Sequence, residues 1–206
     1  MTGALLRNRT TFVAPKLLRM GNVGYAVSLQ DENVPGSIPI GEAATIFDRP
    51  ARVLKLPAPL PPAWVVGGSR PAASPSAALL AIAEPGFEPA AEVILGKDSP
   101  RRPPPEDFHA QCTIRERRAD RLVADVEASA AGHLVVAEAY QEGWRATVDG
   151  AATPVMPANV LFRAVVVPPG SHRLELRYRP PAVFWGAGIT AAGLATLIML
   201  TLRRER

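Results

Sequence analysis

Residues 133–179 carry short apolar and polar alternations that are separated by tight-turn signals. In Trp144–Val148 every second residue is apolar, and this period of two is typical of a strand with one face buried and one face in water. Asp149-Gly150 follows, and both residues tolerate the positive φ that a two-residue hairpin turn demands. Residues 174–178 repeat the alternation after Pro169-Gly170, a pair that suits a type II turn. The pattern predicts antiparallel strands joined by short turns.

More strand signals surround this region. Residues 161–167 form a nearly continuous apolar run rich in β-branched residues, which indicates a more central strand. Ala110–Arg117 and Arg121–Ala128 are expected to pair as a hairpin, and residues 134–140 to form a further strand. Because no helical run intervenes, parallel crossover connections are disfavoured. We therefore expect residues 108–180 to fold as an antiparallel β-sandwich.

Residues 1–96 are expected to form a small α+β part. Ser74 is a favourable N-cap and Pro75 is tolerated at the first helical position, so a helix is predicted at Pro75–Ala83. With strands at residues 60–66 and 92–95, this helix would complete a strand-helix-strand unit.

The proline content argues against a helical bundle. Proline accounts for 22 of 206 residues, roughly twice the usual frequency of about 5%. Four prolines lie in residues 97–107, with charged residues on both sides. This composition predicts an extended, exposed linker between the α+β part and the sandwich. The fold class is therefore mainly β.

The chain ends with an apolar segment. Residues 182–202 comprise 21 residues without a charge, long enough at about 1.5 Å per residue to cross a hydrocarbon core of about 30 Å. We expect a single transmembrane helix in the lipid bilayer, with Gly188 and Ala192 allowing another helix to approach closely. The basic tail at residues 203–206 favours a cytoplasmic C-terminus under the positive-inside rule. The main domain would then be extracytoplasmic.

The C-terminal half contains a characteristic combination of short motifs. They are Tyr140, Gly143-Trp144, the turn Val148-Asp149-Gly150, Asn159 ahead of Phe162-Arg163-Ala164-Val165, Pro169-Gly170 and Tyr178-Arg179-Pro180. Together they resemble the C-terminal region of bacterial YfhO-family membrane proteins. Members of that family are large multi-span proteins similar to lipid-linked sugar transferases, and this domain lies on the outer side of the membrane.

The resemblance implies a noncatalytic extracytoplasmic domain with its membrane anchor. The family's catalytic acidic residues lie in the multi-span portion, so none is implied for this chain. We expect the chain to be the last part of a longer protein implicated in lipid-linked sugar transfer to cell-envelope polymers. Residues 1–30 have no apolar core of the signal-peptide kind, so upstream spans would have to carry the domain across the membrane.

Four side chains are candidates for contact with a glycan, a lipid-linked sugar or an acceptor: Tyr140, Trp144, Arg145 and Arg163. A tryptophan on a sandwich rim can stack on a sugar ring, and arginine can bind hydroxyl or phosphate groups. Trp144 also begins an inward alternation, which favours a core position. Arg163 interrupts an apolar strand, where it either faces solvent or pairs with Glu138 across the sheet.

We expect no catalytic residue, no cofactor and no metal site. The three histidines have no metal-ligand spacing, and neither a nucleophile motif nor a glycine-rich phosphate loop is present. Asp125 and Glu127 share one strand face, the ordinary position of exposed carboxylates. The single cysteine, Cys112, is expected to be a buried, inert thiol. The net charge of +4 comes from dispersed arginines, so nucleic-acid binding is not expected.

Two other functions stay open. One is a stand-alone, membrane-anchored module that binds carbohydrate or mediates adhesion. The other is a tail-anchored interaction protein, whose folded domain would remain in the cytoplasm.

Overall fold

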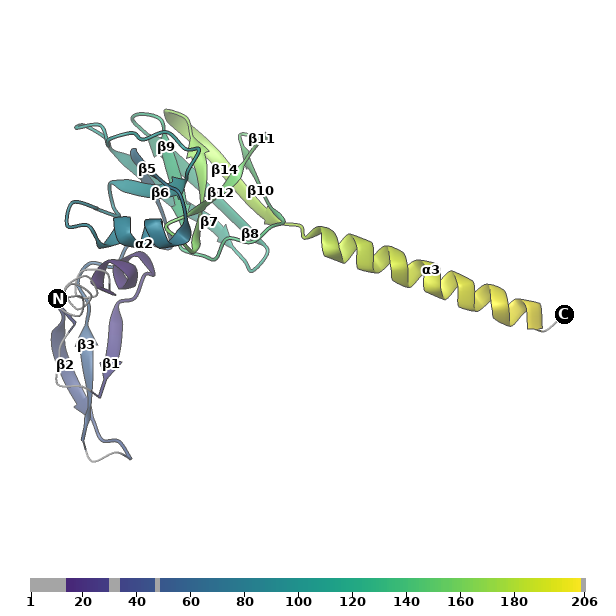
Figure 1. The fold of residues 1–206 in the computed structure, drawn as a ribbon, viewed down its shortest axis with the longest axis horizontal. Coiled ribbons are helices and arrows are strands. Elements are labelled where there is room, and N and C mark those ends of the chain that lie inside the picture. Colours follow the sequence, from purple (N-terminus) through teal and green to yellow (C-terminus); the bar gives the residue numbers. More distant parts are fainter. Residues whose placement is uncertain (1–13, 30–33, 47–48, 205–206) are drawn as a thin grey trace.

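Two antiparallel sheets face each other across one hydrophobic core in the computed structural model of this protein (Figure 1). The structure describes residues 14–29, 34–46 and 49–204. In order, the five-stranded sheet contains β11 (Ala151–Thr153), β10 (Trp144–Val148), β14 (Gly170–Tyr178), β8 (Arg121–Ala128) and β7 (Ala110–Arg117). The four-stranded sheet contains β12 (Val155–Ala158), β13 (Phe162–Val167), β9 (Gly132–Val136) and β4 (Ala63–Val66). The predicted mainly β fold with one C-terminal helix is confirmed.

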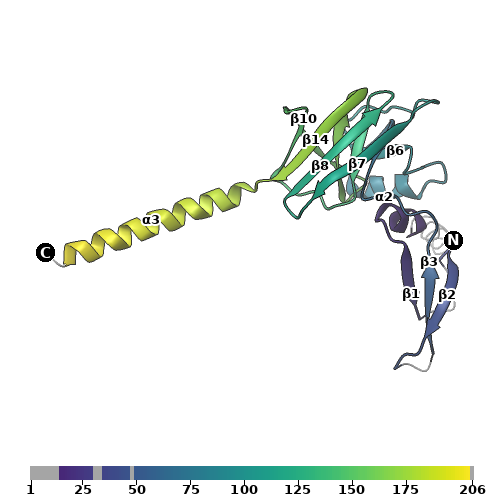
Figure 2. The same cartoon turned by 180° about the vertical axis from the view of Figure 1, so that it is seen from behind.

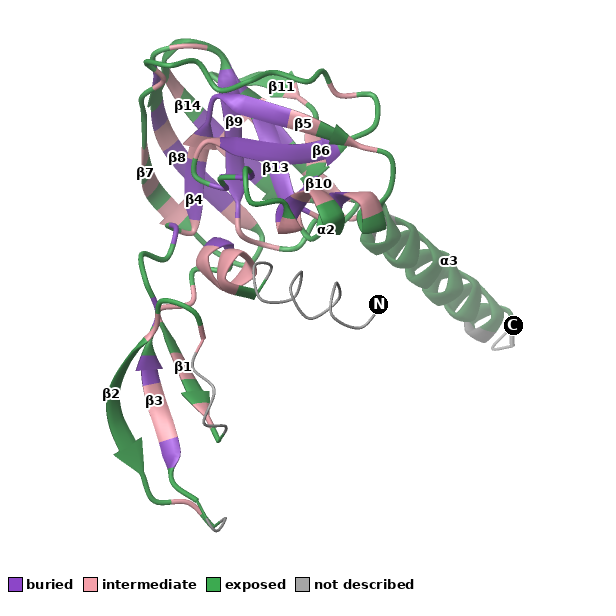
Figure 3. Ribbon diagram, turned by 60° about the vertical axis from the view of Figure 1, so that its left-hand side comes forward, coloured by how far each residue is buried: buried purple, intermediate pink, exposed green. Residues whose placement is uncertain are grey.

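Alternation along the strands sets which side chains form this core. In β14, Leu174 and Leu176 are buried between the sheets, while Glu175 between them faces outward. In β9, by contrast, all five residues are buried. This strand is buried on both faces because a further layer covers the outer side of the four-stranded sheet (Figure 3).

The further layer consists of α2 (Pro75–Ala83), β5 (Gly68–Ala72) and β6 (Glu92–Gly96). The predicted helix is confirmed, and its N-cap Ser74 accepts a hydrogen bond at Oγ from the Ala77 amide (3.1 Å). The first strand of the strand-helix-strand unit was assigned wrongly. It is β5, parallel to β6, whereas β4, within the predicted segment 60–66, pairs with β9.

Two glycines explain why the chain leaves one sheet and enters another. A Cβ on Gly67 would lie 2.7 Å from the Phe108 ring, and a Cβ on Gly68 would lie 2.9 Å from Cβ of Glu92. No other residue type fits this close approach without displacing its neighbours. The chain can therefore pass from β4 to β5 within two residues.

Residues 97–107 are largely exposed, as predicted. They are nevertheless attached to the body, because the backbone of Arg102 exchanges two hydrogen bonds with buried Ser69 (2.8 and 2.9 Å). The predicted division of the chain at this segment stays a prediction. The structure adds that β4, which precedes the segment, belongs to the same sheet as β9.

Two elements project away from the body in different directions (Figure 2). One is the three-stranded sheet of β1 (Tyr25–Ser28), β3 (Ala51–Lys55) and β2 (Ile38–Ala43), which follows helical residues 14–20. The other is α3 (Pro181–Arg204).

Among the described residues, α3 is the one helix long and apolar enough to cross a membrane. Its apolar part spans Pro181–Leu200 and has a mean hydropathy of 1.8, and none of the residues whose burial is described there is buried (Figure 3). Of the predicted basic tail, Arg203 and Arg204 are helical, and residues 205–206 lie outside the described residues.

Candidate functional site

An open groove lies at the end of the five-stranded sheet, where the chain enters α3. It encloses about 660 Å³ and brings together three of the four predicted contact residues, Tyr140, Trp144 and Arg145. Pro181, the first residue of α3, lines the same groove. The fourth candidate, Arg163, does not line it, and its side chain is only 2% exposed.

Arg163 lies beneath the groove because of strand parity. In β13, Ala164 packs on the outer layer and Val165 packs between the two sheets. Since alternate strand residues share a face, Arg163 is on the side of Val165, at the end of the inter-sheet core. Its Cζ lies 3.6 Å from the ring centroid of Trp144, in the opposite sheet. The pair therefore connects the two sheets by a cation–π contact.

The other contacts of Arg163 hold it in place. It forms an ion pair with Glu138 and donates a hydrogen bond to the Ala139 carbonyl (3.3 Å). The hypothesis that Arg163 pairs with Glu138 is thus confirmed, and the solvent-facing alternative is wrong. Burial lowers the pKa of the Arg163 guanidinium from its usual value, and the Glu138 carboxylate acts in the opposite direction. Its Nε atom is buried and has no hydrogen-bond partner among the residues that the structure describes.

Trp144 is half-buried and has two roles. It packs against the inter-sheet core and pairs across the strands with Tyr178, their ring centroids 5.3 Å apart. Its remaining surface lines the groove. The core position expected for Trp144 is therefore partly realised, and contact with a sugar stays a prediction.

The loop before β10 is fastened to the segment that leads into α3. Gly143 has φ +105°, and a Cβ there would lie 2.9 Å from Cα of Pro180. The Arg179 amide donates a hydrogen bond to the Gly143 carbonyl (2.8 Å). Only glycine combines this backbone conformation with this close approach. The groove therefore has a fixed position relative to the first residue of α3.

One family matches this part of the chain. Residues 108–190 match the model of the bacterial membrane protein YfhO. They form a YfhO-family region. The match runs from just before β7 through β14 and ends at residue 190, within α3, so it includes the groove together with the first part of the apolar helix. No curated protein and no solved structure matches the chain. The YfhO-family match and the exposed apolar helix α3 support membrane association.

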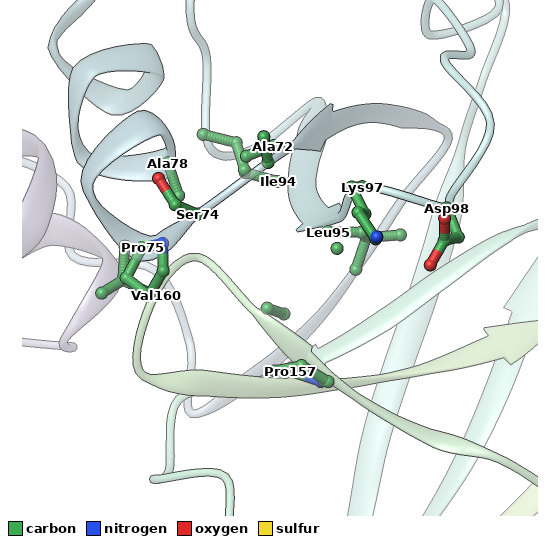
Figure 4. A pocket seen from close by; sticks show the side chains of 13 residues that line it. Ala72, Ser74, Pro75, Ala78, Ile94, Leu95, Lys97, Asp98, Pro157 and Val160 are labelled. Atoms are coloured by element: carbon green, nitrogen blue, oxygen red, sulfur yellow. The ribbon is translucent and has the colours of Figure 1, made fainter.

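A second hollow, which no sequence pattern predicted, lies between the YfhO-family region and the preceding layer. It encloses about 340 Å³ and is largely apolar. Figure 4 shows Pro75 and Val160 on one side of it and Lys97 with Asp98 on the other. Buried Asn159 forms two hydrogen bonds with Ile94 beside this hollow. Its side-chain Oδ1 accepts from the Ile94 amide, and its backbone amide donates to the Ile94 carbonyl (both 2.8 Å).

Two titratable groups of the YfhO-family region that the sequence drew attention to are Cys112 and Asp125. Cys112 is half-buried rather than fully buried as expected, and this burial raises the pKa of its thiol to about 11, which disfavours the reactive thiolate. Asp125, which shares a strand face with Glu127, forms an ion pair with Arg115 (2.6 Å). Among the described residues, no group of three or more histidine, cysteine or acidic side chains is placed to hold a metal ion.

Proposed function

We propose that this chain is the noncatalytic extracytoplasmic domain and membrane anchor of a YfhO-like protein. The multi-span remainder of that protein would transfer sugars from a lipid carrier to a cell-envelope polymer. The observation that carries the proposal is the continuous family match, which covers every strand of the sandwich except β4 and continues into the start of α3. Because the match continues from the sandwich into α3, it supports a domain that functions next to the bilayer surface.

The groove is the part of this domain suited to guide a sugar or an acceptor. Tyr140 is 36% exposed and Arg145 is exposed, so an aromatic face and a guanidinium are both available to a ligand. Because Pro181 lines the same groove, a ligand held there would lie close to the membrane surface. Arg163 and Glu138 would act as positioning residues, since they support Trp144 from below.

Orientation is the first point to test. In the proposed arrangement α3 crosses the bilayer, the C-terminus is cytoplasmic and the exposed segment 97–107 is outside. Protease added to spheroplasts should then cut this segment while a cytoplasmic marker protein survives. Protection of the segment until the membrane is lysed would instead indicate the tail-anchored, cytoplasmic arrangement and would refute the proposal.

A stand-alone carbohydrate-binding module is the second candidate, and the exposed surface of Tyr140 in an open groove favours it. A glycan array with the purified chain in detergent separates the two functions. Saturable binding that is lost in Tyr140→Ala, in a protein without in-frame apolar spans encoded upstream, supports the module. Absence of binding, together with in-frame apolar spans encoded upstream, supports the terminal domain of a larger transferase. In either case Tyr25→Ala is a suitable control, because Tyr25 is 61% exposed and lies in the projecting sheet.

A further inference from the structure

Three arginines meet on the outer face of the five-stranded sheet, at the end that leads into α3. Arg145 in β10 and Arg177 in β14 are directly opposite each other in the antiparallel ladder. Arg179 follows two residues later and precedes Pro181, where α3 begins. A hollow of about 260 Å³ is lined by Arg145, Thr147, Glu175, Arg177 and Arg179.

Positive charge is in excess in this hollow. Glu175 is the one carboxylate among the lining residues, and it is shared, because Arg177 and Arg121 both donate to it. Neither Arg145 nor Arg179 forms an ion pair with a carboxylate of residues 14–29, 34–46 or 49–204. Like charges that face each other across a ladder destabilise the sheet. An anion bound between the arginines would relieve this repulsion.

The arginines also lie at a defined level relative to the apolar helix. A strand rises about 3.3 Å per residue, so Arg177 is within roughly 13 Å of the start of α3 along the chain. Trp185, 76% exposed one turn into α3, is of the residue type that prefers the membrane interface. Between these positions the chain must pass the headgroup layer, where lipid phosphates are found. Guanidinium groups bind phosphate with bidentate hydrogen bonds.

We propose that Arg145, Arg177 and Arg179 form a binding site for the phosphate of an anionic phospholipid in the leaflet that α3 enters. The site rests on the anchoring part of the proposed function and is independent of sugar transfer and of the side on which the domain lies. The bound headgroup holds the end of the sheet against the bilayer. It thereby keeps the groove, which shares Arg145, at headgroup level.

Native mass spectrometry of the full chain tests this site. The chain is reconstituted in nanodiscs that contain equal amounts of phosphatidylglycerol and phosphatidylcholine, and the lipids that stay bound after release are identified by mass. The unmodified chain should retain phosphatidylglycerol in preference to phosphatidylcholine. The variant R145Q/R177Q/R179Q should lose that preference, by roughly fivefold for each arginine removed.

The matched control, R101Q/R115Q/R173Q, removes the same charge at exposed positions outside the hollow and should keep the preference. Equal retention in the site variant and the unmodified chain overturns the proposal. So does an equal loss in the control, since net charge would then explain the effect. If inorganic phosphate added to nanodiscs of phosphatidylcholine alone occupies the site in an arginine-dependent manner and displaces lipid, the assignment to a lipid is overturned. Carbonate extraction of each variant reports separately on anchoring, so failure of the headgroup site and failure of the anchor are distinguishable.

Discussion

The guanidinium of Arg163 lies over the indole of Trp144, with Cζ 3.6 Å from the ring centroid. These residues belong to opposite sheets of the sandwich. Their contact lies below the groove that leads to α3, so a change at Arg163 acts on the groove through the residue that lines it. The same contact therefore contributes to the stability of the sandwich and to the shape of the groove.

The ion pair of buried Arg163 with half-buried Glu138 is expected to make a large contribution to stability. Glu138→Gln should lower the free energy of unfolding by about 2–4 kcal/mol, because it leaves the buried Arg163 guanidinium without its carboxylate. The control is Arg117→Gln, which removes a second contact with Glu138 (2.9 Å) from a side chain that is 48% exposed. That change should cost less than about 1 kcal/mol. Urea unfolding in detergent, followed by tryptophan fluorescence, measures both.

A double-mutant cycle isolates the pair itself. Arg163→Ala and Glu138→Ala are expected to show a coupling energy of about 1–3 kcal/mol, as residues in one network do. A coupling energy near zero would mean that the two side chains do not depend on each other in solution.

Gly143 is expected to be intolerant of any side chain. Gly143→Ala places a Cβ 2.9 Å from Cα of Pro180 in a backbone with φ +105°, and should destabilise the chain by about 2–4 kcal/mol. Gly150→Ala is the matched control, because φ there is +85° and no atom lies within 4 Å of the added Cβ. It should cost only about 1 kcal/mol. Equal losses in the two variants would show that the junction with Pro180 can shift freely.

The pair of His172 and Asp149 is expected to depend on pH. Both ring nitrogens of His172 face acceptors, the Asp149 carboxylate at 2.6 Å and the Pro169 carbonyl at 3.0 Å. The charged ring, which donates from both nitrogens, is therefore favoured. The hydrogen bond with Asp149 first, and that with Pro169 second, raise the pKa of His172 above its ordinary 6.5. The stabilisation is then complete below about pH 6.5 and is lost as the pH rises through the folded-state value.

The pKa of Asp149 sets the lower limit of the pH range in which the pair of His172 and Asp149 stabilises the fold. Its hydrogen bonds with His172 and with the Arg173 amide lower its pKa below the ordinary 3.8. Its contribution is therefore present above about pH 3.8 and is lost as the pH falls through the folded-state value. In an NMR titration Asp149→Asn should move the pKa of His172 back toward 6.5. His133, whose pKa burial lowers, should not respond; a parallel shift there would indicate general unfolding.

Cys112 should be nearly unreactive in the folded chain. Its pKa of about 11 against an ordinary 9.0 reduces the thiolate fraction near neutral pH about a hundredfold. Alkylation by iodoacetamide, followed by mass spectrometry, should be slow in the native chain and fast in denaturant. Rapid alkylation without denaturant would contradict the raised pKa of this half-buried side chain.

Local patterns were sufficient for most of the strands and for α2. The period of two in Trp144–Val148 and the Ser74 cap of α2 depend on residues that are neighbours in sequence, and the structure confirms both. The same holds for the hairpin of β7 and β8, whose predicted bounds match. Tyr140, Trp144 and Arg145 were found together in the groove because they lie within six residues of one another.

Pairing over long distances was beyond what those patterns could indicate. An apolar run such as Ala63–Val66 can pair with any strand that offers a complementary edge, and its position beside β9 follows from how three layers bury one another's apolar faces. The environment of Arg163 arises in the same way. The residues adjacent to Arg163 in sequence indicate only that an arginine interrupts an apolar strand. The packing of the two sheets places Glu138 and Trp144 in contact with it. Local propensity depends on residues that are near neighbours in sequence, whereas burial depends on residues from distant parts of the chain. The positions of β4 and of the Arg163 side chain therefore follow only from the packing of the complete layers.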